Sequence, residues 1–315
     1  MGTQDQSIPL LEIHDLAVQR GDLEVIKGLS FKVSEGEVFG LIGPNGSGKS
    51  STFSVLTGLL SPQAGSILLR GKQVTGGSQS LRRELGVVFQ NPSLDPHMSA
   101  RENLELSARL YRVPRAESLA RIQELLRFAD LVDRADERVS TFSGGMKPRL
   151  ELARSLIHEP KILLMDEPTT GLDEAAFQRT WKRLLRLRDE RGVSILLSTH
   201  RPEEAAFCDR IAFINDGGLV ACDTPKALQE QVSGDRLLIQ CQNPEPSRVQ
   251  LETILSLQCE IVDGGLSLHC DEGHTLIPRI VEALPEGEIR SAQLLRPNLG
   301  DVFLKLTGQN LLEDA

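Results

Sequence analysis

The chain has 315 residues, is 40% hydrophobic and carries a net charge of −9. This length allows one large domain and a smaller one. No apolar run reaches the 18 residues of a membrane-spanning helix, and residues 1–9 lack the basic start and apolar stretch of a signal peptide. Five scattered cysteines without a C-x-x-C pair are expected to be reduced thiols. We therefore expect a cytoplasmic protein.

The first two thirds of the chain alternate between strand-like and helix-like segments. Strands are predicted at residues 11–18, 29–33, 38–42, 66–69, 85–89, 162–165 and 194–197, and helices at 49–59 and 174–191. Between residues 100 and 132, leucines and isoleucines recur at three- and four-residue spacings, which indicates a helical segment. The alternation predicts an α/β fold with a largely parallel sheet and helices on both faces.

The composition changes near residues 230–235, where a short polar stretch contains Ser233 and Gly234. Beyond it, residues 232–315 hold 13 acidic and 6 basic residues, which argues against nucleic acid or anionic lipid as a partner of this segment. The predicted order is strand 236–242, helix 247–257, strand 259–262, strand 266–270, helix 275–284, strand 289–295 and helix 300–306. The first six elements form βαββαβ, typical of a ferredoxin-like domain. We expect two domains, residues 1–231 and 232–315.

A basic run at residues 179–191 has two interpretations. It could contact lipid or nucleic acid, but acidic residues are mixed into it and Leu184, Leu185 and Leu187 supply an apolar side. This pattern favours a helix with one solvated and one buried face.

Residues 43–50 match the phosphate-loop pattern G-x-x-x-x-G-K-[ST], with a predicted strand before and a helix after. Glycines let backbone amides approach phosphates, and the helix N-terminus adds donors. Lys49 should reach the β- and γ-phosphates of a nucleoside triphosphate, and the Ser50 hydroxyl should bind Mg²⁺. The expected nucleotide contacts here are Gly43, Pro44, Asn45, Gly46, Ser47, Gly48, Lys49, Ser50 and Ser51.

Two carboxylates and a histidine follow apolar runs downstream. Asp166 ends a predicted strand, at the sheet edge where ligands bind in α/β proteins. Asp166 suits the Mg²⁺-holding acid and the adjacent Glu167 a residue acting on the attacking water. His200 closes the run 195–199, and Gln90 follows the predicted strand 85–89. Taken alone, His200 and Gln90 are weak indications of a functional site.

Ser143, Gly144 and Gly145 stand within Thr-Phe-Ser-Gly-Gly-Met-Lys at residues 141–147. Together with the phosphate loop and the acidic strand end, in this order, they resemble the nucleotide-binding subunit of an ABC transporter. The resemblance covers about residues 9–230. It implies a P-loop NTPase domain with a parallel-core sheet, an antiparallel β subdomain and a helical subdomain at about residues 91–160.

The resemblance also implies roles within one chain. ATP and Mg²⁺ are the expected ligands. Lys49 matches the Walker A lysine and Asp166 the Walker B aspartate. Glu167 matches the catalytic glutamate, His200 the switch histidine, and Gln90 the glutamine that senses the metal and the γ-phosphate.

Other matched residues are expected to act across a dimer. Ser143 and Gly145 match signature residues that complete the ATP site of an opposite protomer, and Asp173 matches the D-loop. Glu102-Asn-Leu104, the Gly-Gly-Met form of the signature and residues 297–308 are similar to type-2 exporters, including the daunorubicin-resistance kind. This implies a homodimer of ATPases attached to a separate membrane subunit, on the cytoplasmic face of the inner membrane, exporting a drug, lipid or other small molecule.

Two positions depart from the family pattern. Where the family often stacks an aromatic residue on adenine, this chain has Arg20, which could stack through its guanidinium or remain solvated. At position 148 the family usually has a polar or basic residue and this chain has proline. If Ser143 caps the following helix, Pro148 removes a helical hydrogen bond, and Pro148→Arg should raise ATPase activity.

Two rival functions remain to be weighed. A soluble ABC ATPase of repair or translation would carry coiled-coil insertions, zinc modules or a second cassette, and none of these patterns occurs in the sequence. A subunit that binds ATP without hydrolysing it would not need Glu167 and His200.

Overall fold

The computed structural model describes residues 8–89, 93–231, 235–262, 264–270, 273–295, 298–309 and 311. The chain divides into two compact units. The first contains residues 1–225 and 311–315, and the second contains residues 226–310.

The first unit contains an antiparallel sheet built at its N-terminal end. Strands β1 (Leu11–Arg20) and β2 (Leu23–Val33) pair across a tight turn at Gly21 and Asp22. They are joined by β4 (Ala64–Leu69) and β5 (Lys72–Val74) in the order β2-β1-β4-β5. The turn has the expected position, and β2 begins six residues earlier than the predicted strand 29–33.

A second sheet of six strands forms the centre of this unit. Its order is β10 (Gly218–Asp223), β9 (Arg210–Asn215), β3 (Val38–Ile42), β8 (Ser194–Thr199), β7 (Ile162–Asp166) and β6 (Leu85–Val88). All adjacent pairs are parallel except β10 with β9. The strands β3 and β8 are buried throughout, which explains the apolar runs at residues 38–42 and 195–197. The predicted parallel-core sheet is confirmed.

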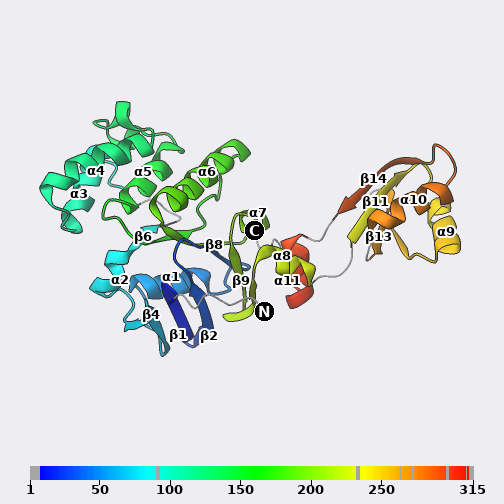
Figure 1. The fold of residues 1–315 in the computed structure, drawn as a ribbon, viewed down its shortest axis with the longest axis horizontal. Helices are drawn as coiled ribbons and strands as arrows, with labels where there is room; N and C mark the ends of the chain where they lie inside the picture. The colour runs from blue at the N-terminus through cyan, green and yellow to red at the C-terminus, as the bar shows by residue number, and fades with distance from the viewer. Residues whose placement is uncertain are drawn as a thin grey trace. The chain divides into compact units, whose positions relative to one another are not determined.

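Helices cover both faces of the central sheet. Figure 1 shows α1 (Lys49–Thr57) with the antiparallel sheet on one side and the helices that follow β6 on the other. Those helices are α3 (Ala100–Leu110), α4 (Arg115–Phe128), α5 (Met146–Ser155) and α6 (Glu174–Arg191). Shorter helices are α2 (Gln79–Glu84) and α7 (Pro202–Ala205), with 3-10 turns at Val132–Arg134 and Val139–Thr141. One apolar core joins α1 and both sheets.

Helix boundaries follow local chemistry. Helix α1 ends two residues before the predicted limit because Gly58, at φ 81°, turns the chain into the left-handed region and caps the last turn. Helix α6 spans the predicted residues, with Asp173 accepting a hydrogen bond from the Ala176 amide at its N-terminus and Gly192 ending it at φ 63°. Asp173 is thus the residue directly before the helix, and its side chain caps the first turn.

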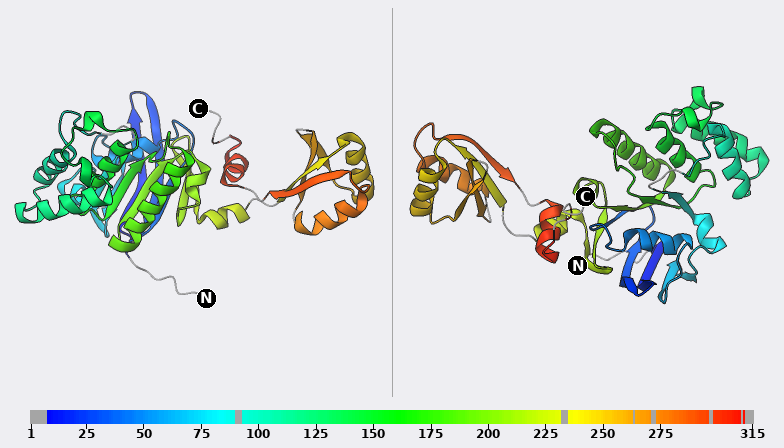
Figure 2. Two further views of the ribbon diagram at one scale, coloured as in Figure 1. Left: turned by 90° about the horizontal axis from the view of Figure 1, so that it is seen from above. Right: turned by 180° about the vertical axis from the view of Figure 1, so that it is seen from behind.

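The second unit contains a four-stranded antiparallel sheet in the order β12-β13-β11-β14. Its strands are β11 (Asp235–Cys241), β12 (Cys259–Val262), β13 (Gly265–Cys270) and β14 (Ile289–Leu295). Helices α9 (Pro244–Leu255) and α10 (Gly273–Ala283) pack on it around one apolar core, as Figure 2 shows, so the observed order is βαββαβ. The remaining helices of the unit are α8 (Pro225–Glu230) and α11 (Leu299–Thr307), the latter with a capping box at Asn298 and Asp301.

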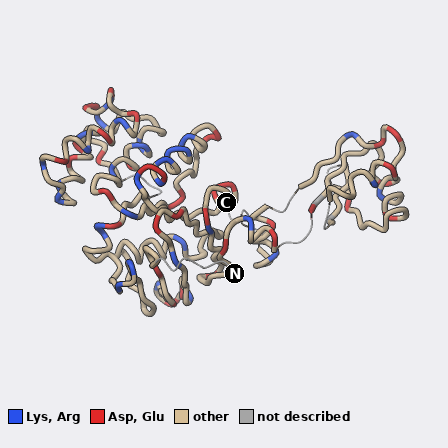
Figure 3. The backbone as a smooth tube through the Cα atoms, viewed as in Figure 1, with Lys and Arg blue, Asp and Glu red and all other residues tan. Residues whose placement is uncertain are grey.

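The basic run on α6 has the two faces expected from its pattern. Phe177, Trp181, Leu184 and Leu187 are buried, whereas Leu185 is only partly covered. Arginines of the other face pair with acids of neighbouring elements, as between Arg191 and Glu124, and Figure 3 shows both charges around this helix. The helix therefore has a solvated, charge-paired face.

Two further observations concern the whole of the described chain. No helix in the parts that the structure describes is long and apolar enough to cross a membrane. The five cysteines form no disulfide among these residues, and Cys208, Cys241 and Cys259 are buried, as expected of reduced thiols.

Candidate nucleotide site

The loop between β3 and α1 has a conformation that its glycines make possible. Gly46 and Gly48 have φ of 79° and 105°, a region that side chains disfavour. A Cβ atom at Gly43 would lie 2.1 Å from the Ile214 carbonyl oxygen, so only glycine fits there. The N-terminus of α1 has no side-chain cap. Its first amides are therefore available to an anion.

Lys49 lies at the centre of this loop and is 5% exposed. Its Nζ donates hydrogen bonds to the carbonyl oxygens of Gly43 and Pro44 at 2.7 and 2.8 Å. Burial lowers the pKa of Lys49 to about 8, although the Glu167 and Asp166 carboxylates act to raise it. The Ser47 hydroxyl is also buried, and no partner for it is found in the described part of the chain. An ammonium group, a spare hydroxyl and an uncapped helix end fit a polyphosphate.

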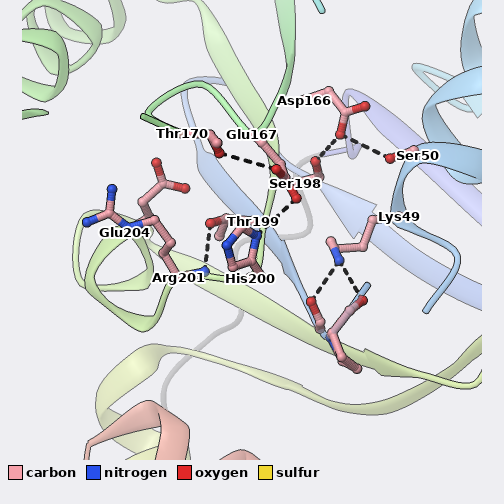
Figure 4. Close-up of polar contacts among 12 residues, drawn as sticks. Lys49, Ser50, Asp166, Glu167, Thr170, Ser198, Thr199, His200, Arg201 and Glu204 are labelled. Atoms are coloured by element: carbon pink, nitrogen blue, oxygen red, sulfur yellow. Dashed lines mark hydrogen bonds and ion pairs between the residues drawn. The ribbon is translucent and has the colours of Figure 1, made fainter. Parts of the chain in front are cut away.

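Ser50 and Asp166 come together beside the lysine. The Ser50 hydroxyl donates to Asp166 Oδ1 at 3.3 Å, and the Ser198 hydroxyl of β8 donates to the same oxygen. Figure 4 shows this group at the carboxyl ends of β7 and β8, above the loop. Hydroxyl and carboxylate oxygens are ligands suited to Mg²⁺, so the donor set fits that ion.

Glu167 has an unusual backbone and two side-chain partners. Its φ is 48°, in the left-handed region that costs a non-glycine residue about 1 kcal/mol. His200 Nδ1 lies 3.0 Å from Glu167 Oε1, and the Thr170 hydroxyl donates to Oε2 at 3.2 Å. The backbone turns the carboxylate toward the histidine, and both oxygens are held in place (Figure 4).

The segment Ser143–Gly145 lies at a different place in the same unit. All three residues are exposed. Ser143 and Gly145 border a pocket of about 310 Å³ together with Pro168 and Leu172, so they adjoin the turn that follows Glu167. Among the described residues, no hydrogen bond or ion pair joins this segment to the phosphate loop.

The start of α5 bears on the expectation about Pro148. The helix begins at Met146 and no side chain caps it, so the Ser143 hydroxyl is not a cap, and Pro148 is the third residue of the helix. Gly145 already has helical φ and ψ of −79° and −19°, and the Lys147 amide donates to the Ser143 carbonyl oxygen at 3.4 Å, as in a helix. The next amide in this series would be that of residue 148, so the proline removes one hydrogen bond in the first turn, where proline is tolerated.

The remaining candidates are placed by their elements. Arg20 ends β1 and is exposed, and Ser51 is half-buried in the first turn of α1. Gln90 lies outside the described residues. Asp173 is exposed and caps α6.

Several side chains around this site were not predicted from the sequence. Ser198 and Thr170 contact the two carboxylates directly. Glu204 of α7 accepts a hydrogen bond from Thr169. Of these residues, only Ser198 could have been noticed in the sequence, because it lies two residues before His200 at the end of an apolar run.

The fold and this grouping define a phosphate-loop nucleotide hydrolase. The family model described as ABC transporter matches residues 26–170. The chain is 40% identical over 308 residues to the Nod factor export ATP-binding protein I of Burkholderia orbicola (strain AU 1054), covering 97% of this chain and 99% of the relative. The protein of the same name in Rhizobium meliloti (strain 1021) is 40% identical over 304 residues, covering 96% of this chain and 89% of that one.

Solved structures agree with this assignment. The cbiO1 protein of Clostridium perfringens, part of the ABC transporter complex cbiONQ, superimposes with a TM-score of 0.65 at 26% identity, over 79% of this chain and 96% of that chain. The dimeric ATP-binding cassette MJ0796 in a post-hydrolysis state, bound to ADP and Pi, has a TM-score of 0.61 at 27% identity, over 68% of this chain and 98% of that one.

The chain belongs to the ATP-binding subunits of ABC transporters, within the exporter group, and it is an ATPase. The predicted family, fold and activity are confirmed. A repair or translation ATPase is not favoured, because export subunits match nearly the whole chain.

Proposed function

We propose that this chain hydrolyses ATP with Mg²⁺ and drives export through a separate membrane subunit. The observation that carries the proposal is the convergence of Lys49, Asp166, Glu167 and His200 at one edge of the central sheet (Figure 4). Two carboxylates, a buried ammonium and a histidine at the carboxyl ends of parallel strands form a typical site for phosphoryl transfer.

Each group then has a role in the chain's own chemistry. Lys49 and the backbone amides of residues 43–51 bind the phosphates. Ser50 and Asp166 hold Mg²⁺, together with Gln90. When bound, the ion neutralises the charge that develops on the transferred phosphoryl group.

Glu167 orients the attacking water and accepts its proton. Because Thr170 and His200 hold both carboxylate oxygens, the base has a defined direction before ATP arrives. His200 also reaches the γ-phosphate. Preorganised groups of this kind account for much of the rate enhancement in phosphoryl transfer.

We further propose that the site acts in a homodimer. Ser143, Gly144, Gly145 and Asp173 contact the ATP held by the second copy, and this fits the exposure of all four residues. The dimeric state of the similar cassette bound to ADP and Pi supports the proposal. Arg20 contacts the base of the nucleotide.

The membrane partner and the cargo are also proposals. The subunit binds the cytoplasmic face of the inner membrane through an integral-membrane partner, which selects the cargo. The relatives are named as Nod factor export proteins, and this supports export of a small molecule rather than import. Residues 1–231 serve as the ATPase domain and 232–315 as a ferredoxin-like accessory domain, and the compact unit 226–310 supports a boundary close to this.

Two experiments test the proposal. Phosphate release should require Mg²⁺ and fall to background in Glu167→Gln. Affinity purification from solubilised membranes should retrieve an integral-membrane subunit. Wild-type phosphate release by Glu167→Gln would remove Glu167 from its role, and purification without any membrane protein would remove the transporter partner.

A further inference from the structure

A buried hydrogen bond joins α7 to the turn that follows Glu167. The Thr169 hydroxyl donates to Glu204 Oε1, and the two residues are 0% and 1% exposed. Glu204 stands four residues after His200, whereas Thr169 stands two residues after Glu167. The contact therefore links the segments that carry the two partners of the Glu167–His200 pair.

A second contact from the same region holds the backbone of Thr169. Arg201 Nη1 donates to the Thr169 carbonyl oxygen at 3.4 Å, and the Arg201 amide donates to the Thr199 hydroxyl at 2.9 Å. The guanidinium lies 5.0 Å from the centre of the Phe177 ring on α6, which fixes its direction. Thr169 is thus held by its side chain from Glu204 and by its carbonyl from Arg201.

The turn from Glu167 to Thr170 depends on where Thr169 lies. The Thr170 amide donates to the Glu167 carbonyl at 3.3 Å, and the Thr170 hydroxyl donates to Glu167 Oε2. A shift of Thr169 moves Thr170, and Thr170 then releases one oxygen of the Glu167 carboxylate. Because Glu167 already has a strained φ, the turn needs an external hold to keep it.

A carboxyl group at the buried position of Glu204 carries a desolvation cost. Burial raises the pKa of Glu204, while hydrogen bonds from the Thr169 and Thr199 hydroxyls act against that change. An apolar side chain of similar size would avoid the desolvation cost. What the carboxyl adds is a directional acceptor, which packing alone does not supply.

We propose that Glu204 is a positioning residue for the hydrolytic step, which keeps Glu167 aimed at its water by holding Thr169. The proposal rests on the role given above to Glu167. Glu204 does not touch the substrate in this scheme, and nucleotide binding at the phosphate loop does not depend on it.

The test compares four single variants and one double variant of the whole chain. Glu204→Leu removes the acceptor, Thr169→Val removes the donor at nearly constant volume, and Glu204→Gln retains an acceptor oxygen. Glu190→Gln is the control for loss of one carboxylate, because Glu190 is an exposed acid at the end of α6 that pairs with Arg186. The measurements are kcat, KM for ATP and the melting temperature.

We expect kcat to fall about tenfold in Glu204→Leu and in Thr169→Val, with KM changed less than about twofold. Glu204→Gln should recover kcat to within about threefold of the wild type, and Glu190→Gln should have the wild-type kcat. The double variant Thr169→Val/Glu204→Leu should be no slower than the single ones, since both remove one contact.

Other outcomes overturn the proposal. A wild-type kcat in Thr169→Val and Glu204→Leu would do so, as would a loss that Glu204→Gln does not recover. If Glu204→Leu fails to fold, Thr169→Val and Glu204→Gln still decide the matter through the split between kcat and KM. Should Glu167→Gln hydrolyse ATP at the normal rate, the proposed function fails first. If Glu167→Gln is inactive while Thr169→Val hydrolyses ATP at the wild-type rate, the proposed function stands and only the role of Glu204 is excluded.

Discussion

His200 and Glu167 form a pair in which Nδ1 of the ring lies 3.0 Å from Oε1 of the carboxylate. The side chains are only 24% and 14% exposed, so water competes weakly for the contact. Because a carboxylate accepts, the ring donates through Nδ1. The pair therefore fixes the ring tautomer and the direction of the carboxylate together.

Glu167→Gln should slow phosphate release by on the order of 100-fold or more, since an amide cannot accept the proton of the attacking water. ATP should still bind and hold two copies together. Size-exclusion chromatography with ATP and Mg²⁺ should therefore show a stable dimer for this variant and not for the wild type. A variant that stays monomeric under these conditions would contradict the proposed dimeric site.

ATP binding should be coupled to proton uptake by Lys49. With its pKa near 8 in the nucleotide-free protein, this lysine is about half charged at pH 8, and anionic phosphates favour the charged form. Binding should take up to about 0.5 proton at pH 8, and ATP affinity should fall as the pH rises through 8.

Titration calorimetry in two buffers with different ionisation enthalpies measures this uptake. Lys226→Met, which removes a lysine on the exposed side of α8, is the control and should leave it unchanged. Equal binding enthalpies in both buffers would exclude the coupling.

Pro148→Arg should leave the ATPase rate within about twofold of the wild type. Position 148 is the third residue of α5 and lies in its first turn, where proline is tolerated, so one restored hydrogen bond should change little. Phosphate release at saturating ATP is the measurement. A rate several times higher would show that proline distorts the signature helix in a way that the backbone does not reveal.

Arg20→Tyr should tighten ATP binding by about 1 kcal/mol, because an aromatic ring stacks on a base more strongly than an exposed guanidinium does. Arg20→Ala separates the two interpretations of the arginine. It should weaken binding if the guanidinium stacks on adenine and change nothing if it is solvated. A fluorescent ATP analogue gives both constants, and unchanged affinity in Arg20→Tyr would place the base elsewhere.

His158 should make the protein sensitive to acid. Its ring stacks on Tyr111 with centroids 3.7 Å apart, its Nε2 lies 2.9 Å from the Leu85 carbonyl, and burial lowers its pKa to about 4. Between pH 6.5 and 4 the unfolded chain binds a proton that the folded chain does not. The free energy of unfolding should therefore fall as the pH falls, by about 2 kcal/mol between pH 7 and 5.

Urea unfolding of the wild type and of His158→Gln at both pH values tests this contribution. Between pH 7 and 5, the free energy of unfolding should fall less for His158→Gln than for the wild type, and the difference should equal the contribution given above. His97→Gln, which removes an exposed imidazole, should behave as the wild type does. Equal acid sensitivity of His158→Gln and the wild type would show that another group is responsible.

The central strands could be predicted because they are buried on both faces. Runs such as residues 38–42 and 195–197 are apolar, and they lead to the phosphate loop and to His200. The edge strands β5 and β10 were missed, since most of their residues are exposed or half-buried and show little alternation. The strand β9 was also missed, although its residues 211–214 are apolar and buried. Helix α7 was missed because four residues show no periodicity.

The site could be predicted as a set of motifs but not as a set of contacts. Lys49, Asp166, Glu167 and His200 stand in recognisable surroundings along the chain. Glu204 does not, because an acid one turn after His200 is usually solvated, and only the packing of α7 buries it. Pro148 is the third residue of α5 and not the fifth, because the helix begins at Met146, although the Ser143 carbonyl already accepts a hydrogen bond from the Lys147 amide.

The left-handed backbone of Glu167 sets activity against stability at one position. Glycine adopts φ near 48° at little cost, so Glu167→Gly should relax the turn and could make the protein harder to unfold while abolishing hydrolysis. Selection for thermal stability alone would then drive this residue away from glutamate. Glutamate at this position therefore lowers the stability of the fold and provides a catalytic base that is already oriented.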